Sequence, residues 1–501
     1  MLLNNLLATK SVEDLKAAGE TGELKRSLGP YALTAIGIGG IIGTGIFVLT
    51  GLAAAQHAGP AIVLSFVLAG IGCIFAGLCY AEFASMIPVS GSAYAYSYAT
   101  LGEGVAWFIG WNLVLEYLFA ASTVAVGWSR YLVKFLEQLD INFIPQALSM
   151  APLDFSDEKG FFATGAMINL PAMFVVAVVT TILVLGIRQS STTNAIVVAI
   201  KVAIVLLVIV VGAYYVNPDH WQPFIPENTG KFGAYGWSGI LRASGVIFFA
   251  YIGFDAVSTA AQESKNPQRD VPIGILASLI ICTILYVLMS GVLTGLLPYP
   301  QLNDAAPVAT ALEAHAGLRW LSIPVTFGAL AGLTSVILVM MLAQSRIFYS
   351  MSRDGLLPHA FRACHPEWKT PVFSTVLTGV CAGIMGGVLP LNVLGEIVSS
   401  GTLLAFVTVC IGVMVLRVTK PDLPRPFRMR WPWLCGIGGV VFCGAMLFSL
   451  FFEGGTLVRI IGWTIIGMAI YFLYGYRHSA LRRNGGDVRG AQAARQPGGS
   501  A

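Results

Sequence analysis

Three ionisable residues lie inside long hydrophobic runs of this sequence, where a charge is seldom kept without a purpose. They are Glu116, Lys201 and Asp255. A charged side chain at the centre of a transmembrane helix costs about 2.5 to 3.5 kcal/mol even on a lenient insertion scale, so these residues are candidates for binding a ligand or moving a proton. We expect Glu116 to face a cavity and hold an ammonium or guanidinium group. We expect Lys201 to exchange a proton.

Each of the three also has a structural interpretation. The ammonium of Lys201 could reach the membrane interface along its flexible stem, and a neutral Glu116 could join two helices by hydrogen bonding. Asp255 could cap a half-helix by accepting its first backbone amides, or it could take part in a gate. Near the inner end of another run, four residues are expected to build an inner gate: Glu82, Tyr94, Tyr96 and Arg353.

Two of the hydrophobic runs carry glycines that a plain membrane anchor does not need. The first run holds five glycines within nine residues: Gly37, Gly39, Gly40, Gly43 and Gly45. The second run, residues 248–255, places Gly253 two residues before its aspartate. Glycine in a helix interior costs about 1 kcal/mol relative to alanine, so both runs favour an unwound segment near the middle of the membrane.

Paired breaks of this kind are the best sequence pointer to the binding site of a transporter, because unwound backbone offers free amides and carbonyls at mid-membrane. The N-terminal end of a half-helix favours a carboxylate, and carbonyls at a C-terminal end favour an ammonium. A site that offers both ends suits an amino acid. The alternative is that the glycines only allow close helix packing, since Gly39 and Gly43 have small-xxx-small spacing.

The composition places these runs in a lipid bilayer. Of the 501 residues, 56% are hydrophobic and 11% are charged, and the mean hydropathy is +0.77. Soluble domains carry about 25% charged residues, so the soluble, secreted and nucleic-acid-binding classes are disfavoured. Eight cysteines without a C-x-x-C pair and six histidines in loops or at span ends argue against a disulfide framework, a metal site or a haem.

Twelve windows are apolar enough to cross the bilayer as helices, which takes about 20 residues each. They cover approximately residues 30–55, 60–87, 102–127, 167–187, 193–216, 239–261, 272–297, 317–349, 372–390, 393–417, 431–453 and 456–476. Most lysines and arginines fall on the inner side when both termini are cytoplasmic. The sequence thus predicts a multi-pass protein of the cell inner membrane, with cytoplasmic tails at 1–28 and 477–501 and Arg242 at the outer interface.

Several short strings follow one another between residues 28 and about 420. They are Gly37 to Phe47, Tyr80-Ala81-Glu82, Pro88 to Tyr96, Gly110 to Leu113 with Glu116, Phe254-Asp255, Glu263 to Pro272, and Ser352 to Pro358. Together they resemble the amino acid-polyamine-organocation superfamily, and within it the bacterial relatives of the cationic amino acid transporters. The resemblance implies an all-α membrane protein with the LeuT-like fold, whose first and sixth helices are broken. Residues 29–216 and 238–417 would form two inverted repeats of five spans each, and 431–476 two additional helices.

The resemblance also implies where the substrate binds. Backbone amides near Thr44 and Gly45 would receive its carboxylate. Its ammonium would be received by the carbonyls of Ile41, Phe249, Ala250 and Ile252. Phe249 would also cover the site from the outside, while Gly39, Gly43 and Gly253 would permit the breaks.

Two further roles follow from the same resemblance. Lys201 would stand where sodium-coupled relatives hold a sodium ion, against the first and eighth helices, so its ammonium would replace that ion. Met340 or Met341 would fill the side-chain pocket, and this apolar bulk favours small or neutral substrates over cationic ones.

We therefore expect a secondary active permease, not an enzyme, that moves an L-amino acid together with a proton by alternating access. No P-loop string is present, so the energy must come from a gradient or from exchange and no cofactor is expected. The partners would be the small substrate and the lipid bilayer, with a monomer as the working unit. The alternatives are an exchanger of cationic amino acids or polyamines, or a sensor that binds amino acids without moving them.

Overall fold

A computed structural model of the chain describes residues 6–10, 28–89, 91–141, 143–156, 159–186, 191–304, 306–452 and 455–482. Most of the two predicted tails, 1–28 and 477–501, lies outside these residues.

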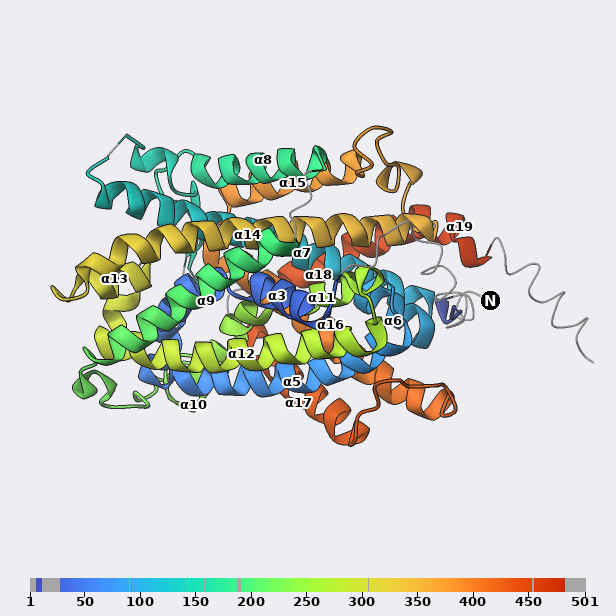
Figure 1. The fold of residues 1–501 in the computed structure, drawn as a ribbon, viewed down its shortest axis with the longest axis horizontal. Coiled ribbons are helices and arrows are strands. Elements are labelled where there is room, and N and C mark those ends of the chain that lie inside the picture. The colour runs from blue at the N-terminus through green and yellow to red at the C-terminus, as the bar shows by residue number, and fades with distance from the viewer. Residues whose placement is uncertain are drawn as a thin grey trace, which may run out of the picture.

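Long apolar helices dominate the described chain (Figure 1). Within the described residues, nine helical segments are long and apolar enough to cross a membrane, and three shorter apolar helices accompany them. The long segments include α5 (Ile62–Met86), α7 (Glu103–Gln138), α9 (Ser191–Ala213), α12 (Pro267–Leu296), α14 (Arg319–Arg353), α16 (Leu391–Thr419), α17 (Pro432–Phe451) and α18 (Thr456–Ile470). The shorter ones are α3 (Pro30–Ile41), α8 (Leu170–Val184) and α15 (Val372–Val388).

The first glycine-rich run is interrupted where its glycines predict. Helix α3 ends at Ile41, and Ile42 is extended with ψ of 100°. The chain resumes in three short helical pieces: η1 (Gly45–Leu49), α4 (Thr50–Ala53) and η2 (Ala54–Ala58). A Cβ atom added to Gly45 would lie 2.3 Å from the Cα atom of Ala250, so only glycine permits this approach of the two broken helices.

The second interruption lies directly opposite the first. Helix α10 (Gly236–Ile247) tightens into the 3₁₀ turn η6 (Phe248–Tyr251), and the short helix α11 (Ala256–Thr259) follows the break. Gly253 has φ of +118°, a conformation that L side chains rarely adopt. A Cβ atom there would also come within 2.7 Å of the carbonyl carbon of Gly40. The two unwound segments therefore touch.

Three regions that lie between the predicted spans contain regular structure. The α6 helix (Ser92–Thr100) precedes α7, and α13 (Pro307–Glu313) precedes α14. Strands β1 (Leu153–Ser156) and β2 (Gly160–Ala163) pair antiparallel. Helix α7 also continues past its predicted end at residue 127 to Gln138, and Lys134 in this extension forms an ion pair with Glu313 at 2.7 Å.

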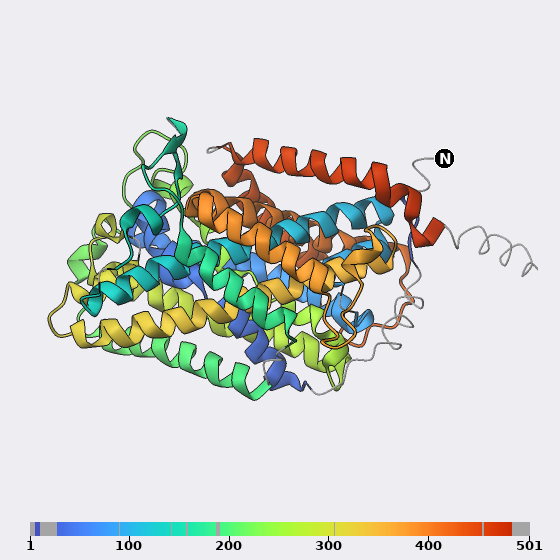
Figure 2. The ribbon, with the colours of Figure 1, turned by 90° about the horizontal axis from the view of Figure 1, so that it is seen from above.

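The two ends of the molecule differ (Figures 1 and 2). The hairpin, α13 and the connection between α9 and α10 gather at one end, and the N-terminal segment and α19 (Tyr476–His478) lie at the other. Helix α18 runs along the outer edge of the bundle (Figure 2, red). The two breaks lie between these ends, where they are enclosed by the long helices.

Candidate functional site

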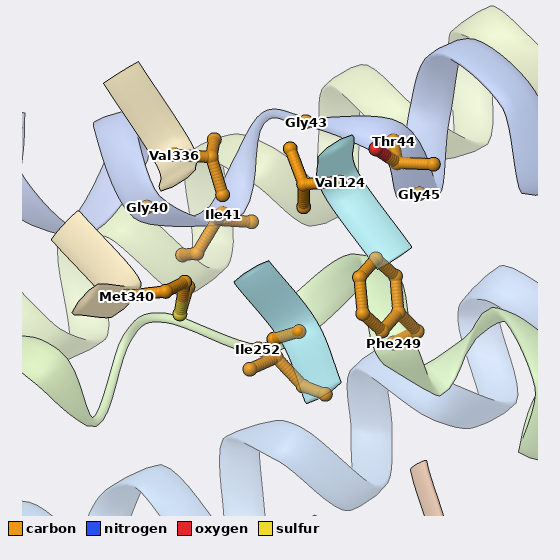
Figure 3. A pocket seen from close by; sticks show the side chains of 11 residues that line it. Gly40, Ile41, Gly43, Thr44, Gly45, Val124, Phe249, Ile252, Val336 and Met340 are labelled. Atoms are coloured by element: carbon orange, nitrogen blue, oxygen red, sulfur yellow. The ribbon is translucent and has the colours of Figure 1, made fainter. Parts of the chain in front are cut away.

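A small cavity lies at the meeting point of the two breaks (Figure 3). The cavity is narrow in this structure, with room for about one water molecule. Its walls come from both broken helices and from α7 and α14, in the form of Gly40, Ile41, Gly43, Thr44, Gly45, Ala120, Val124, Phe249, Ile252, Val336 and Met340. Five of the predicted substrate-contacting residues thus line one cavity, namely Ile41, Thr44, Gly45, Phe249 and Ile252.

One side of the cavity suits an anion. The second half of the first broken helix starts at Thr44, and no side chain caps it. Amides in the first turn of a helix have no partner within that helix, and the positive end of the helix dipole adds to their attraction for a carboxylate. The hydroxyl of Thr44 is buried and lacks a hydrogen-bond partner among the described residues, so a bound carboxylate would satisfy it.

The opposite side offers carbonyl oxygens, and one tyrosine hydroxyl already lies within hydrogen-bonding distance of two of them. The hydroxyl of Tyr286, on α12, lies 2.7 Å from the carbonyl oxygen of Ile41 and 2.9 Å from that of Ala250. The carbonyl of Phe249 accepts the amide of Ile252 at 3.2 Å. Three of the four carbonyls expected to receive an ammonium therefore have internal partners, although each can accept a second hydrogen bond. Tyr286 lies outside the motifs described above, so the sequence did not identify it as a candidate.

The remaining walls are apolar. Ala120, Val124, Val336 and Met340 contribute only hydrocarbon and a thioether. Met340 lines the cavity, whereas Met341 is buried elsewhere. The side chains of Val124 and Val336 were not singled out by the sequence, because a valine in a membrane span gives no sign of facing a site.

Lys201 lies beside the first break, against the helices that the sequence predicts. Its Nζ donates to the carbonyl oxygen of Gly39 at 2.8 Å and to that of Ile42 at 3.1 Å. Its stem packs on Gly332 of α14, where an added Cβ would lie 3.0 Å from Cε. The side chain is only 1% exposed, so it does not reach the interface. Its ammonium instead meets the carbonyl end of α3, where the helix dipole favours a cation.

Glu116 does not line the cavity. It is fully buried on α7, one turn before Ala120, and lies near the hydroxyl of Thr402 on α16. Asp255 lies close enough to interact with it electrostatically. The structure thus brings these two acids to each other and places both outside the cavity wall.

Asp255 does not cap the half-helix that follows it. No capping hydrogen bond involves its side chain. Its carboxylate instead accepts a hydrogen bond from the hydroxyl of Tyr117. Of the two roles considered for Asp255, capping of α11 is not seen, and its carboxylate interacts with Tyr117 of α7 instead.

Glu82, which was expected in an inner gate with Tyr94, Tyr96 and Arg353, forms an ion pair with a residue of α16. Glu82 accepts two hydrogen bonds from Arg417, at 2.9 and 2.5 Å, and one from the amide of Met429 at 3.0 Å. The residue after Arg353 makes the contact at the end of α14, since Asp354 accepts hydrogen bonds from Tyr94 at 2.7 Å and from Lys10 at 2.5 Å. Partners that stand 260 to 347 positions apart cannot be inferred from spacing.

Arg242, which the sequence places at the outer interface, is part of a buried ion pair. Only 2% of it is exposed. It donates to the carboxylate of Glu396 at 2.7 Å and to the carbonyl of Ser449 at 3.0 Å. The same carboxylate accepts a hydrogen bond from Thr456 at 2.7 Å. This cluster joins α10, the first half of the second broken helix, to α16, α17 and α18.

In the described part of the chain, no group of three or more histidine, cysteine, aspartate or glutamate side chains could hold a metal ion. The chemistry of the cavity rests on backbone groups, one threonine hydroxyl and apolar walls.

Comparison with known proteins agrees with this geometry. Residues 28–475 match the family model for amino acid permeases. The branched-chain amino acid permease BcaP of Bacillus subtilis is 46% identical over 478 residues, which cover 95% of this chain and 98% of that protein. The methylthioribose transporter of the same organism is 43% identical over 486 residues, covering 96% and 100%.

A plant relative is also similar. The vacuolar cationic amino acid transporter 4 of Arabidopsis thaliana is 40% identical over 423 residues, covering 84% of this chain and 68% of that protein. The chain therefore belongs to the amino acid permease family, within the amino acid-polyamine-organocation superfamily.

Proposed function

We propose that this permease is a secondary active transporter that carries small apolar L-amino acids across the cell inner membrane together with protons. The observation that carries the proposal is the cavity between the breaks, which combines free amides at a helix start, carbonyls at a helix end and a wall of aliphatic side chains. Amides and carbonyls would bind the groups that every amino acid shares. The wall formed by Val124, Val336 and Met340 would select an apolar side chain, and BcaP is by name a permease for branched-chain amino acids.

The proposed architecture is twelve spans in which two groups of five are inverted repeats. The nine long and three short apolar helices of the described chain support this number, since the segment Gly45–Met86 contains both the rest of the first span and the second. The breaks after Ile41 and Ile252 fall in the spans that would open each repeat. We also propose that both termini are cytoplasmic, that the permease works as a monomer, and that it is not an enzyme.

The proposed coupling residue is Lys201. Among the described residues its hydrogen-bond partners are the carbonyls of Gly39 and Ile42, not a carboxylate. An ammonium there compensates the negative end of α3, and a neutral amine would lose that charge and one donor. Gain and loss of one proton would therefore change how firmly α9 holds the first broken helix.

A binding screen tests the substrate assignment. A ligand that binds only the folded protein stabilises it by about 2.7 kcal/mol at one hundred times its Kd. Thermal unfolding of the purified protein would be followed with each of the twenty L-amino acids, methylthioribose and putrescine. We expect leucine, isoleucine and valine to raise the Tm most.

Two variants make the screen specific to the cavity. Val336→Phe should remove the shift with leucine by filling the cavity, whereas Ile437→Phe, on the exposed face of α17, should not. Shifts with only arginine, lysine or putrescine would instead favour the cationic exchanger, and shifts with methylthioribose alone would refute an amino acid substrate.

A further inference from the structure

Several basic residues lie between the end of α16 and the start of α17, and they make different contacts. The last turn of α16 carries Arg417, and the connection itself carries Lys420, Arg425, Arg428 and Arg430. Arg417 is paired with Glu82. Arg425 donates to carbonyls at and beyond the end of α16, including that of Lys420 at 2.9 Å. Arg428 and Arg430 are exposed, and in the part of the chain that the structure describes neither has a carboxylate partner.

Arg430 belongs to a groove at the start of α17. The groove is lined by Arg430, Trp431, Pro432, Trp433 and Leu434. The guanidinium of Arg430 lies 5.3 Å from the centroid of the Trp431 ring, and Trp431 and Trp433 are 60% and 52% exposed. Since α17 is apolar enough to span a membrane, these tryptophans stand where a bilayer changes from headgroups to hydrocarbon.

The groove continues into an apolar stripe along α17. Leu434, Ile437, Val441 and Phe448 follow at spacings of three, four and seven residues, which place them on one helix face. They are 58%, 54%, 58% and 60% exposed. A ligand that occupies the groove and extends along α17 would therefore need a charged head and a hydrocarbon body.

We propose that this groove binds one anionic phospholipid. The phosphate of the headgroup would lie on Arg430, with Arg428 adding positive charge, and the acyl chains would lie against the stripe from Leu434 to Phe448. Positive charge without a protein carboxylate to balance it complements an anionic headgroup, while a zwitterionic lipid gains less from it. The site does not depend on the transported substrate. With both termini in the cytoplasm, as proposed above, this lipid would belong to the inner leaflet.

Native mass spectrometry of the whole protein in detergent tests this site. The probes are palmitoyl-oleoyl phosphatidylglycerol, phosphatidylcholine with the same chains, and glycerol 3-phosphate as a headgroup without chains. We expect retention of one phosphatidylglycerol, weaker retention of phosphatidylcholine and no displacement by glycerol 3-phosphate. Removing one arginine near the membrane surface weakens anionic lipid binding about fivefold, so Arg430→Gln should lower the affinity by about that factor.

Two double variants, each of which removes two positive charges, are compared, and the second changes a different part of the surface. Arg428→Gln with Arg430→Gln should lose phosphatidylglycerol, whereas Arg362→Gln with Lys369→Gln, two exposed basic residues before α15, should keep it. All four side chains are exposed, so an unchanged Tm is expected for both variants. Equal retention by the two double variants, equal binding of phosphatidylcholine, or displacement by glycerol 3-phosphate would each overturn the proposal.

Discussion

A single hydroxyl, that of Tyr286, links the carbonyl sides of both breaks. It lies within hydrogen-bonding distance of Ile41 and Ala250, but it has one proton to donate. One of the two carbonyls can therefore always turn to another donor. An ammonium entering the cavity would find this acceptor in place.

Replacing Tyr286 by phenylalanine tests this role. The change leaves a buried carbonyl pair without a donor, which costs about 1 to 3 kcal/mol. We expect a lower Tm in the absence of substrate and a larger Tm increase on adding leucine, because the ligand then supplies the missing donor. Tyr214→Phe, which removes an exposed hydroxyl, is the control. An unchanged Tm for Tyr286→Phe would contradict the assigned role.

Residues with charge were easier to anticipate than residues without it. Lys201 stood out because an ammonium in an apolar run needs a partner, and the placement against the first broken helix followed from the family resemblance. Tyr286, Val124 and Val336 are ordinary residues of membrane helices. Their importance arises only from which face of each helix meets the cavity, and a helix buried on all sides does not reveal that face in its sequence.

At the scale of helices, the approach of the two broken segments depends on Gly45. A Cβ atom there would overlap Ala250, and forcing extra atoms into a packed core costs about 1 to 3 kcal/mol or more. We expect Gly45→Ala to lower the Tm and to abolish substrate binding, since the cavity would be distorted. Gly444→Ala in α17 meets no atom within 4 Å and serves as the control. Normal leucine binding by Gly45→Ala would refute the close approach.

The ion pair between Arg242 and Glu396 holds α10, the first half of the second broken helix, against α16. Breaking a buried pair by removing one partner costs about 3 to 5 kcal/mol, and the 14% exposure of the Glu396 side chain points to the lower end. We expect Arg242→Met to lower the Tm by several degrees, and exposed Arg362→Met to leave it unchanged. Equal Tm values for the two variants would show that the pair contributes no stability.

The sequence predicted where the two helices break, but it did not predict every contact and element of the fold. Glycines at 37–45 and 253 mark both interruptions, because no other residue tolerates the positive φ at Gly253 or the contact at Gly45. The pairing of Arg242 with Glu396 was not predictable, since the residues stand 154 positions apart and neither lies in a recognisable motif. The hairpin β1–β2 was missed because each strand has only 4 residues, too few for an alternating pattern to stand out.

At the scale of the whole molecule, segments near both chain ends contact the same residue, Glu103. Glu103 at the start of α7 is fully buried and accepts hydrogen bonds from Tyr98 at 2.9 Å and Tyr471 at 2.8 Å, and also from Ser479 and Arg482. Its backbone amide donates to the carbonyl of Ala8 at 3.0 Å. One carboxylate thus anchors the C-terminal helix beside the N-terminal segment.

We expect Glu103→Gln to release residues 479–482, because the ion pair with Arg482 and the charge-assisted bonds from Ser479 and Tyr471 are lost together. Limited trypsin digestion should then cut after Arg482 several times faster than in the wild type. The exposed Glu367→Gln variant is the control. Identical digestion rates would contradict the anchoring role of Glu103.

The central claim is that the cavity binds apolar amino acids and that protons drive their transport through Lys201. Leucine uptake into proteoliposomes with an imposed pH gradient, acidic on the outside, tests this claim most directly. The wild type should accumulate leucine above its outside concentration and lose this accumulation when the gradient is dissipated. Lys201→Met should bind leucine, as shown by its Tm increase, but should not accumulate it. Accumulation by Lys201→Met equal to that of the wild type, or none by the wild type, would contradict the account.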